Sequence, residues 1–437
     1  MKFNKWTLGL AAIGVVSLAS AAQAADAAST PATVLTALSS TTLSGYVDTS
    51  AQWNPGTGNA NPPPYAFGTG KADGFNLNVV QLSLDKPLDE SQWAAGYHVD
   101  LWLGPNAKFL GTSSYLGTAN LAGDFGIRQA YVALRTPVGN GIDWKIGVFD
   151  TVIGYESLNS PDNPHYTHSY GFTIEPTTHT GLQGTYHFGE AVSATMGIAN
   201  TVGPSINERA FGTPVPVAIY GSPAVQLPLG GDKAESYKTY MGSLSLTAPQ
   251  SMGWLAGSGL YAGFVSGFSS AAYGDQINYY AGATLSTPVT GLKVGAAFDY
   301  LAGAKNAYSW VNASGLGTGP TYINVPDIWS LGLYGSFQAT EKLTFLGRGE
   351  LLNTHSSAGN IYALTATTQY DLWKNVLSRF EFRWDHVEHG DLFGGTPTTV
   401  SNLGSVTGLN STLLSALQPS ANSKNAFMLA ANIIYKF

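Results

Sequence analysis

The chain of 437 residues contains no cysteine, and only 11% of its residues are charged. Without cysteine it can form neither disulfide bonds nor thiolate metal sites. With 27 acidic and 20 basic residues, it also lacks the basic surface that nucleic-acid binding requires. After residue 24 there is no apolar run of the roughly 20 residues that a membrane-spanning helix needs. These absences exclude a disulfide-stapled domain, a nucleic-acid-binding protein and a helical membrane protein.

Glycine and aromatic residues are abundant instead. The chain has 52 Gly, 23 Tyr and 19 Phe, yet its mean hydropathy is only +0.02. Many glycines and tyrosines with few charges are typical of membrane strands that alternate between lipid and water. The length would normally suggest two or three domains, but a closed barrel folds as one unit.

The N-terminus has the three parts of an export signal. Lys2 and Lys5 precede the apolar run 8–22, and Ala22-Gln23-Ala24 forms an A-x-A cleavage site. The run is too short and too rich in Ala, Gly and Ser for a membrane anchor. Loss of the two lysines would change the net charge from −7 to −9. We therefore predict a signal peptide over 1–24, a flexible periplasmic leader over 25–42 and a transmembrane barrel over 43–437.

Apolar and polar residues alternate in a series of stretches from residue 43 onward. Because successive side chains of a strand point to opposite faces, each stretch predicts a strand with one apolar face. Bacterial barrels have an even number of antiparallel strands. We predict about sixteen, near 43–53, 75–85, 93–103, 126–136, 143–150, 179–188, 191–200, 237–248, 257–268, 277–287, 292–302, 327–339, 342–352, 360–371, 376–388 and 425–437.

The connections between these stretches alternate in length. Short links such as 86–90 alternate with mostly long links rich in Gly, Pro, Asn and Ser, such as 104–125, although two outer links, 269–276 and 353–359, are short. Short periplasmic turns and long extracellular loops are the pattern of outer-membrane barrels. The predicted fold is therefore all-β, a closed antiparallel transmembrane β-barrel.

Near 75–85 the polar residues change from one face of the strand to the other. An extra residue between them would explain this change, so we predict a β-bulge there.

The final segment has the pattern of a barrel's last strand. Its apolar positions share one parity, while Asn432 and Lys436 fall on the other face. Pairing of this strand with 43–53 would remove both sheet edges, which lipid cannot hydrogen-bond. A terminal aromatic residue commonly serves as the signal for bacterial barrel-assembly machinery, so Phe437 is the predicted assembly signal.

One predicted strand carries an alternating row of charges. Over 378–386 the charged residues alternate with Phe380, Phe382 and Trp384. An Arg or Lys on the lipid face would cost roughly 2–4 kcal/mol near the midplane, so the charges should face the lumen. The same parity argument applies to the strand 342–352. The predicted pore-lining residues are Arg348, Glu350, Arg379, Glu381, Arg383 and Asp385.

Several stretches resemble the OmpL-like family of outer-membrane β-barrel porins. They are Ser44-Gly45-Tyr46-Val47-Asp48, Arg128-Gln129-Ala130-Tyr131-Val132, and the run from Ile142-Asp143-Trp144-Lys145 to Phe149. The similarity is densest over 44–188 and continues at 379–385 and in the last strand. It implies a porin-like barrel and supplies no catalytic residue, cofactor or named substrate.

Motifs for catalysis or metal binding are absent. No H-E-x-x-H, P-loop or G-x-S-x-G sequence occurs. His165 and His168 could share a metal ion only in a helical turn, and solvated loop histidines are the simpler interpretation. Glu381 and Asp385 could suggest a glycosidase pair, but the arginines beside them favour ordinary lumen charges. We predict no enzyme activity, cofactor or metal. A lipase-like or protease-like barrel and a non-conducting structural or adhesive barrel remain as alternatives.

The predicted function is passive diffusion of small hydrophilic solutes across a Gram-negative outer membrane. The expected partners are lipid, the barrel-assembly machinery, the solutes and further copies of the chain in a homo-oligomer. No cofactor is needed, because a concentration gradient drives diffusion. The net charge of −9 after cleavage predicts a weak preference for cations.

Two arrangements are open for the third long outer loop, residues 151–178. By analogy with porins it folds into the pore, where its acidic residues face the arginines of the wall and create a transverse field. Alternatively it lies outside as a lid, and the arginines pair with Glu350, Glu381 and Asp385. The constriction candidates in this loop are Glu156, Asp162, His165, His168 and Glu175.

Overall fold

The computed structural model describes the greater part of the predicted barrel. The described residues are 40–56, 60–65, 69–112, 124–210, 215–217, 225–227, 233–269, 274–305, 307–309, 321–323, 327–355, 358–395 and 421–437. The predicted signal peptide and nearly all of the predicted leader lie outside these residues. No helix in the described part of the chain is long and apolar enough to cross a membrane.

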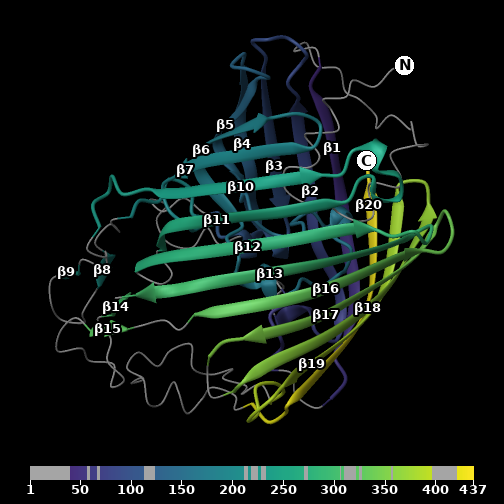
Figure 1. The fold of residues 1–437 in the computed structure, drawn as a ribbon. Helices are drawn as coiled ribbons and strands as arrows, with labels where there is room; N and C mark the ends of the chain where they lie inside the picture. The colour runs from purple at the N-terminus through teal and green to yellow at the C-terminus, as the bar shows by residue number, and fades with distance from the viewer. Residues whose placement is uncertain are drawn as a thin grey trace.

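Sixteen antiparallel strands form one closed barrel, in which each strand pairs with its neighbours (Figure 1). The strands are β1 (Thr42–Trp53), β2 (Gly74–Lys86), β3 (Ala95–Leu103), β4 (Phe125–Thr136), β5 (Ile142–Asp150), β6 (Thr178–His187), β7 (Val192–Ala199), β10 (Thr239–Thr247), β11 (Gly259–Ser269), β12 (Gly274–Ser286), β13 (Leu292–Lys305), β16 (Ile328–Gln338), β17 (Leu343–Asn353), β18 (Asn360–Trp373), β19 (Val376–Val387) and β20 (Asn425–Lys436). All sixteen predicted strands are confirmed, with ends that differ by only a few residues.

The barrel closes between its first and last strands, as predicted. β1 and β20 pair from Tyr46 opposite Lys436 to Trp53 opposite Leu429. Beyond this register, Phe437 and Gly45 exchange two backbone hydrogen bonds of 3.0 Å. Closure leaves no strand edge of the barrel facing lipid, where unpaired backbone groups would find no partner.

The predicted bulge lies in β2. The register between β1 and β2 pairs Asp48 with Val79 and Thr49 with Leu77, so Asn78 is the extra residue. The side chain of Asn78 is fully buried, and its Nδ2 donates to Asp48 Oδ1 at 2.9 Å. The extra residue therefore turns a polar side chain inward and restores the inward parity of the rest of β2.

The wall has an apolar outer face and a polar inner face. On β19, Phe380 is 57% exposed on the outside, whereas its neighbours Arg379 and Glu381 are buried inside. Outward-facing aromatic and aliphatic side chains recur around the barrel, including Phe75, Leu333 and Ile433. In a membrane these side chains contact lipid, which removes the free-energy cost of exposing them to water.

Short elements lie in the connections between strands. The ribbon of β8 (Val215–Val217) and β9 (Val225–Leu227) lies between β7 and β10, and that of β14 (Ala307–Ser309) and β15 (Thr321–Ile323) lies between β13 and β16. Figure 1 shows both ribbons on the side of the barrel away from the C-terminus. The 3-10 helices are η1 (Thr69–Lys71), η2 (Pro105–Leu110), η3 (Ser160–Asp162) and η4 (Gln250–Leu255).

Side chains and one loop fill part of the barrel interior. Ile153 and Tyr155, which follow β5, pack in a buried cluster with Met241, Val265 and Tyr334 from distant strands. The rings of Tyr155 and Tyr334 stack with their centres 4.1 Å apart. The lumen is therefore narrowed by a packed core against one side of the wall.

Candidate functional site

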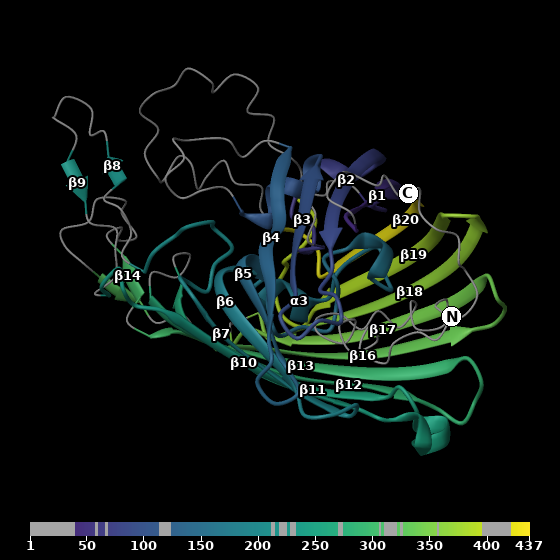
Figure 2. The same ribbon diagram turned by 90° about the horizontal axis from the view of Figure 1, so that it is seen from above.

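The loop between β5 and β6, residues 151–177, runs inside the barrel. We call this segment the β5–β6 loop. Figure 2 shows its short α-helix, α3 (Tyr170–Ile174), within the ring of strands. Ser169 caps α3, since its Oγ accepts a 3.1 Å hydrogen bond from the N–H of Phe172. The loop contacts inward-facing side chains of the wall, as in the first of the two arrangements considered from the sequence, and Arg348 and Arg383 also pair with Glu350 and Asp385, as in the second.

Arg348 on β17 binds the β5–β6 loop through ion pairs and backbone contacts. Its guanidinium lies 2.9 Å from Glu156 of the loop and 2.6 Å from Glu350 of its own strand. It also donates to the carbonyl oxygens of Thr167 at 2.9 Å and His168 at 3.2 Å. An arginine offers five donors in a planar fork, so one side chain can satisfy several loop acceptors at once.

Two carboxylates of the wall accept hydrogen bonds from backbone N–H groups of the loop. Glu381 on β19 accepts from Tyr166 N at 2.6 Å and from Thr167 N at 3.0 Å. Glu350 on β17 accepts from Tyr170 N at 2.6 Å. Charged acceptors form strong hydrogen bonds, and these fix the backbone of the loop just before α3 and at its first residue.

A second guanidinium lies between aromatic rings at the same wall. Arg383 donates to Asp385 at 2.8 Å and to the carbonyl oxygen of His168 at 2.6 Å. The rings of Tyr65 and Tyr170 lie 4.9 and 5.2 Å from its guanidinium carbon, within the range of cation–π contact. The hydroxyl of Tyr170 completes the group by donating to Asp385 at 2.9 Å.

Arg379 holds the segment of the loop around η3. Its guanidinium donates to the carbonyl oxygens of Ser160 at 2.9 Å and Pro161 at 3.5 Å, and also to that of Asn163. Three carbonyl oxygens of one short turn thus converge on one planar cation. In the described residues this contact is the link between η3 and β19.

All six predicted pore-lining side chains point into the barrel, but the β5–β6 loop covers them. None of the six is more than 6% exposed: Arg348, Glu350, Arg379, Glu381, Arg383 and Asp385. In this arrangement they hold the loop in place and do not face open water. Strand parity predicted the side of the wall but not the loop that lies against it.

The predicted constriction residues have different surroundings. Glu156 and His168 are both buried and lie 3.0 Å apart, and His165 Nδ1 lies 2.7 Å from Thr367 Oγ1 on β18. The two histidines therefore contact different groups. Asp162 is partly exposed and accepts a 3.1 Å hydrogen bond from Asn159 Nδ2. Among the described residues, no group of three or more potential ligands could hold a metal ion.

The surroundings of the loop set the charge of two buried side chains. Burial alone would raise the pKa of Glu156, but the nearby charge of Arg348 and the hydrogen bond with His168 bring it well below the ordinary value. Burial lowers the pKa of His165 well below its ordinary value, and the charge of Arg348 lowers it further. Glu156 is therefore an anion and His165 is neutral at pH 7.

A polar cavity of about 660 Å³ lies at the end of the barrel where the chain terminates. We call it the polar cavity. Residues of β1 to β6 form its wall on one side. On the other side its lining consists of Ser157, Asn159, Pro161 and Asp162 of the β5–β6 loop. Both signs of charge line it, including Arg128, Lys145, Asp100 and Asp150.

The charges of the polar cavity were mostly missed by sequence reasoning. Arg128 on β4 donates to Asp150 on β5 at 2.6 Å and also to Asp100 on β3. His98 bridges Asp85 at 2.9 Å and Asp100 at 3.0 Å. His98 and Asp100 share one parity of β3, and both line the polar cavity. The ion pairs of Arg128 with Asp100 on β3 and Asp150 on β5 depend on how β4 is aligned with these two strands. The sequence alone does not specify this alignment.

A closed sixteen-stranded barrel with an apolar outside and a loop held across its inside is the architecture of an outer-membrane porin. Solved structures agree on the fold. The outer membrane channel DcaP of Acinetobacter baumannii is 12% identical, with a TM-score of 0.52 over 91% of this chain and 97% of that one. An anion-selective porin from Comamonas acidovorans is 11% identical, with a TM-score of 0.51 over 91% and 99%. OmpF of Salmonella typhi, in complex with daunomycin, is 9% identical, with a TM-score of 0.54 over 91% and 97%.

The sequence comparison identifies the family. The chain belongs to the family described as "Putative beta-barrel porin-2, OmpL-like", whose profile matches residues 40–416. A search of curated proteins found no match. The family resemblance noted in the sequence is thus confirmed, and the chain is an outer-membrane porin. Membership of a porin family favours a channel over an enzyme.

Proposed function

We propose that the chain lets small hydrophilic solutes diffuse through the barrel, and that the β5–β6 loop forms the narrowest part of their path. The observation that carries this proposal is the position of residues 157–162. Leu158 and Ser160 line a pocket on the outer side of the loop, whereas Ser157, Asn159 and Asp162 line the polar cavity on its other side. One stretch of loop backbone thus separates two spaces of the same barrel.

The chemistry of the polar cavity supports passage of hydrophilic solutes. Its lining combines cations such as Lys145 with anions such as Asp162, together with amides such as Gln129 and Gln183. These groups offer donors and acceptors that replace the hydration shell of a solute at little free-energy cost. The driving force is the concentration gradient, and the proposal requires no cofactor.

Conductance across a planar bilayer tests this function. The purified protein should give steady ohmic current steps, and a protein without steps would contradict a diffusion channel. Because the chain has no cysteine, a single cysteine can be labelled without background. A charged thiol reagent should lower the conductance of Asp162→Cys by about half, since the label narrows an aqueous path beside the loop.

Asn140→Cys is the matched control for this labelling. Asn140 is exposed in the turn between β4 and β5, away from the polar cavity. Labelling there should leave the conductance unchanged. Equal conductance before and after complete labelling of Asp162→Cys would mean that solutes do not pass beside the loop.

Export and assembly are also proposed from the sequence. Residues 1–24 would direct export and be removed after Ala24, which N-terminal sequencing of the mature protein would check. Recognition of the last strand by assembly machinery and association of several copies are predictions of the same kind. The mass of the detergent-solubilised protein would distinguish a monomer from a homo-oligomer.

A further inference from the structure

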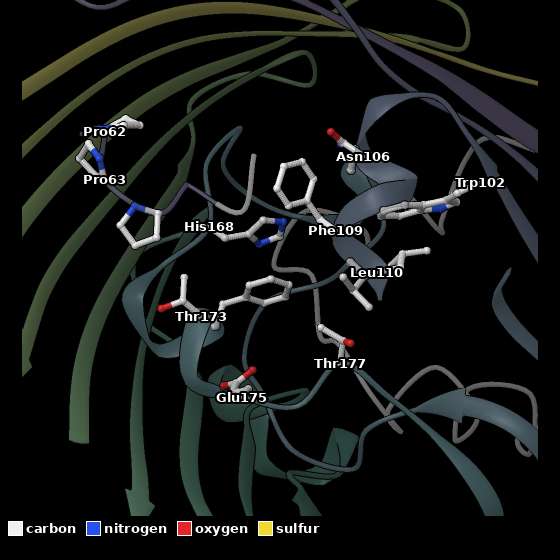
Figure 3. Close-up of a pocket in the computed structure, with 14 residues that line it drawn as sticks. Pro62, Pro63, Trp102, Asn106, Phe109, Leu110, His168, Thr173, Glu175 and Thr177 are labelled. Atoms are coloured by element: carbon white, nitrogen blue, oxygen red, sulfur yellow. The ribbon is translucent and has the colours of Figure 1, made fainter. Parts of the chain in front are cut away.

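A pocket of about 460 Å³ lies on the outer side of the β5–β6 loop (Figure 3). We call it the aromatic pocket. Three separate loop segments form its walls: residues 62–64 after β1, Phe109 and Leu110 of η2, and Leu158 with Phe172 of the β5–β6 loop. Its volume lies within the range of pockets that bind small molecules. It also lies directly before the segment that we propose as the narrowest part of the path.

Aromatic rings reach into this pocket from opposite sides. Figure 3 shows Phe109 and His168 pointing toward one another across it. The ring of His168 stacks on that of Phe172, with centres 3.9 Å apart and planes 13° from parallel. Phe109 is 48% exposed, so its ring is available to a solute. Two ring surfaces facing a common space favour a flat partner placed between them.

Hydrogen-bonding groups surround the rings. Asn106, Ser160, Thr173 and Thr177 belong to the lining, and each offers an amide or a hydroxyl. Asn106 also contacts Lys71, but Lys71 is itself buried and does not line the pocket. A solute in the pocket can therefore keep an apolar ring against Phe109 while its polar groups bind the lining.

The lining carries little net charge. Among the described residues that form it there is no lysine, arginine or aspartate, and its ionisable groups are His168 and Glu175. His168 is bonded to the carboxylate of Glu156, which balances any charge on the ring. Burial raises the pKa of Glu175 well above its ordinary value, and the neighbouring Asp299 raises it further. A solute with a full charge would gain no opposite charge here to offset the loss of its hydration.

We propose that the aromatic pocket binds small uncharged solutes with an aromatic ring and hydrogen-bonding substituents before they pass the β5–β6 loop. The inference rests on the proposed channel function and adds a chemical class of solute to it. The ring would lie between Phe109 and the stacked pair of His168 and Phe172. Its substituents would bond to the amide and hydroxyl groups of the lining.

Block of the ion current by phenyl β-D-glucoside tests the proposal. Methyl β-D-glucoside is the comparison, since it has the same sugar but no phenyl ring. Phenyl β-D-glucoside, added on the side of the long loops, should interrupt the current at a concentration about five- to tenfold lower than methyl β-D-glucoside does. Benzoate should block less well than the phenyl glucoside, because the pocket offers no unpaired cation.

Variants of Phe109 assign the effect to the pocket. Phe109→Ala should raise the half-blocking concentration of phenyl β-D-glucoside about five- to tenfold and leave that of the methyl glucoside unchanged. Phe109→Tyr keeps the ring and should retain the block. Phe188→Ala is the matched control, because Phe188 is a similarly exposed ring, 60% accessible, that does not line the pocket.

The outcomes separate this inference from the proposed channel. Steady conductance with equal block by the two glucosides, or stronger block by benzoate, would overturn the aromatic pocket and leave the channel intact. A silent wild type would contradict the channel. Titration calorimetry of the folded protein in detergent would then test the aromatic pocket without any measurement of current. Equal affinities of the wild type and Phe109→Ala for phenyl β-D-glucoside would refute the pocket.

Discussion

Arg348 on β17 and Glu156 in the β5–β6 loop lie 2.9 Å apart, and both side chains are buried inside the barrel. The hydroxyl of Tyr334 also donates to Glu156 at 3.1 Å. The contact joins the loop to a strand that is paired on both sides, so its loss should affect the loop more than the wall. Four of the five predictions below concern this loop, and the fifth concerns assembly.

The first prediction concerns the ion pair itself. Glu156→Gln leaves Glu350 as the one carboxylate paired with the buried charge of Arg348 among the described residues, and removal of one member of a buried pair costs about 3–5 kcal/mol. We expect the loop to leave its site and the single-channel conductance to rise. Asp143→Asn, which breaks the more exposed pair with Arg135 beside the short turn between β4 and β5, should not change the conductance. Unaltered current steps in Glu156→Gln would show that the pair does not hold the loop.

The second prediction concerns the planar fork of Arg379. In Arg379→Lys the positive charge remains, but one ammonium cannot bind the carbonyl oxygens of Ser160, Pro161 and Asn163 with the same geometry. The segment around η3 should therefore fluctuate, and the open-channel current should become noisier. Arg135→Lys serves as the control. Equal noise in the two variants and the wild type would argue that η3 is held by other contacts.

The third prediction separates two acidic residues that the sequence grouped together. Glu156 is paired with Arg348, whereas Asp162 lines the polar cavity. Asp162→Asn should therefore reduce any preference for cations, seen as a shift of the reversal potential in a salt gradient below about 0.1 M, where screening is weak. Asp391→Asn, in an exposed outer connection, provides the comparison. Identical reversal potentials would place the path of ions away from Asp162.

The fourth prediction concerns pH. Burial raises the pKa of Glu175 above its ordinary value of 4.5, and the groups that face it are Asp299, Glu156 and Tyr280. The docked loop then keeps a proton that the released loop loses, so docking weakens as pH rises above about 4.5. Above about pH 6.5, current fluctuations should therefore increase as pH rises in the wild type, and they should increase less in Glu175→Gln.

His165 gives the opposite dependence, which allows an internal check. Its pKa is lowered by burial, so the released loop gains the proton more readily and docking weakens as pH falls below its ordinary value of 6.5. Glu175→Gln should reduce the increase in fluctuations toward high pH and keep the increase toward low pH. If Glu175→Gln instead removed the increase in fluctuations at low pH, the assignment of the two pH effects to Glu175 and His165 would be wrong.

The fifth prediction concerns assembly. Phe437 continues the pairing of β20 with β1 through Gly45, and its ring lies so close to Gly45 that an added Cβ would come within 2.8 Å of its Cζ. Deletion of Phe437 should lower the amount of barrel in the outer membrane and leave protein in the periplasm, measured by cell fractionation. Lys436→Gln should have a smaller effect. Equal outer-membrane yields for the deletion and the wild type would remove Phe437 as the assembly signal.

The sequence by itself determined the wall of the barrel. Lipid on one side and water on the other impose an alternation of period two on every strand, and this pattern can be read locally. For the same reason it revealed the bulge, since Asn78 interrupts the alternation at one point. The short turns and long loops then gave the topology, because antiparallel neighbours need only short connections.

The tertiary structure alone decided the path of the β5–β6 loop and the use of the charges inside. Arg348 meets Glu156 across 192 residues of sequence, and Arg379 meets Ser160 across 219. No periodicity links such positions. They are brought together only when closure of the barrel sets which strands face each other and where the loop can satisfy its backbone groups. Parity therefore placed these side chains on the inner face, whereas only the folded loop determined what they bind.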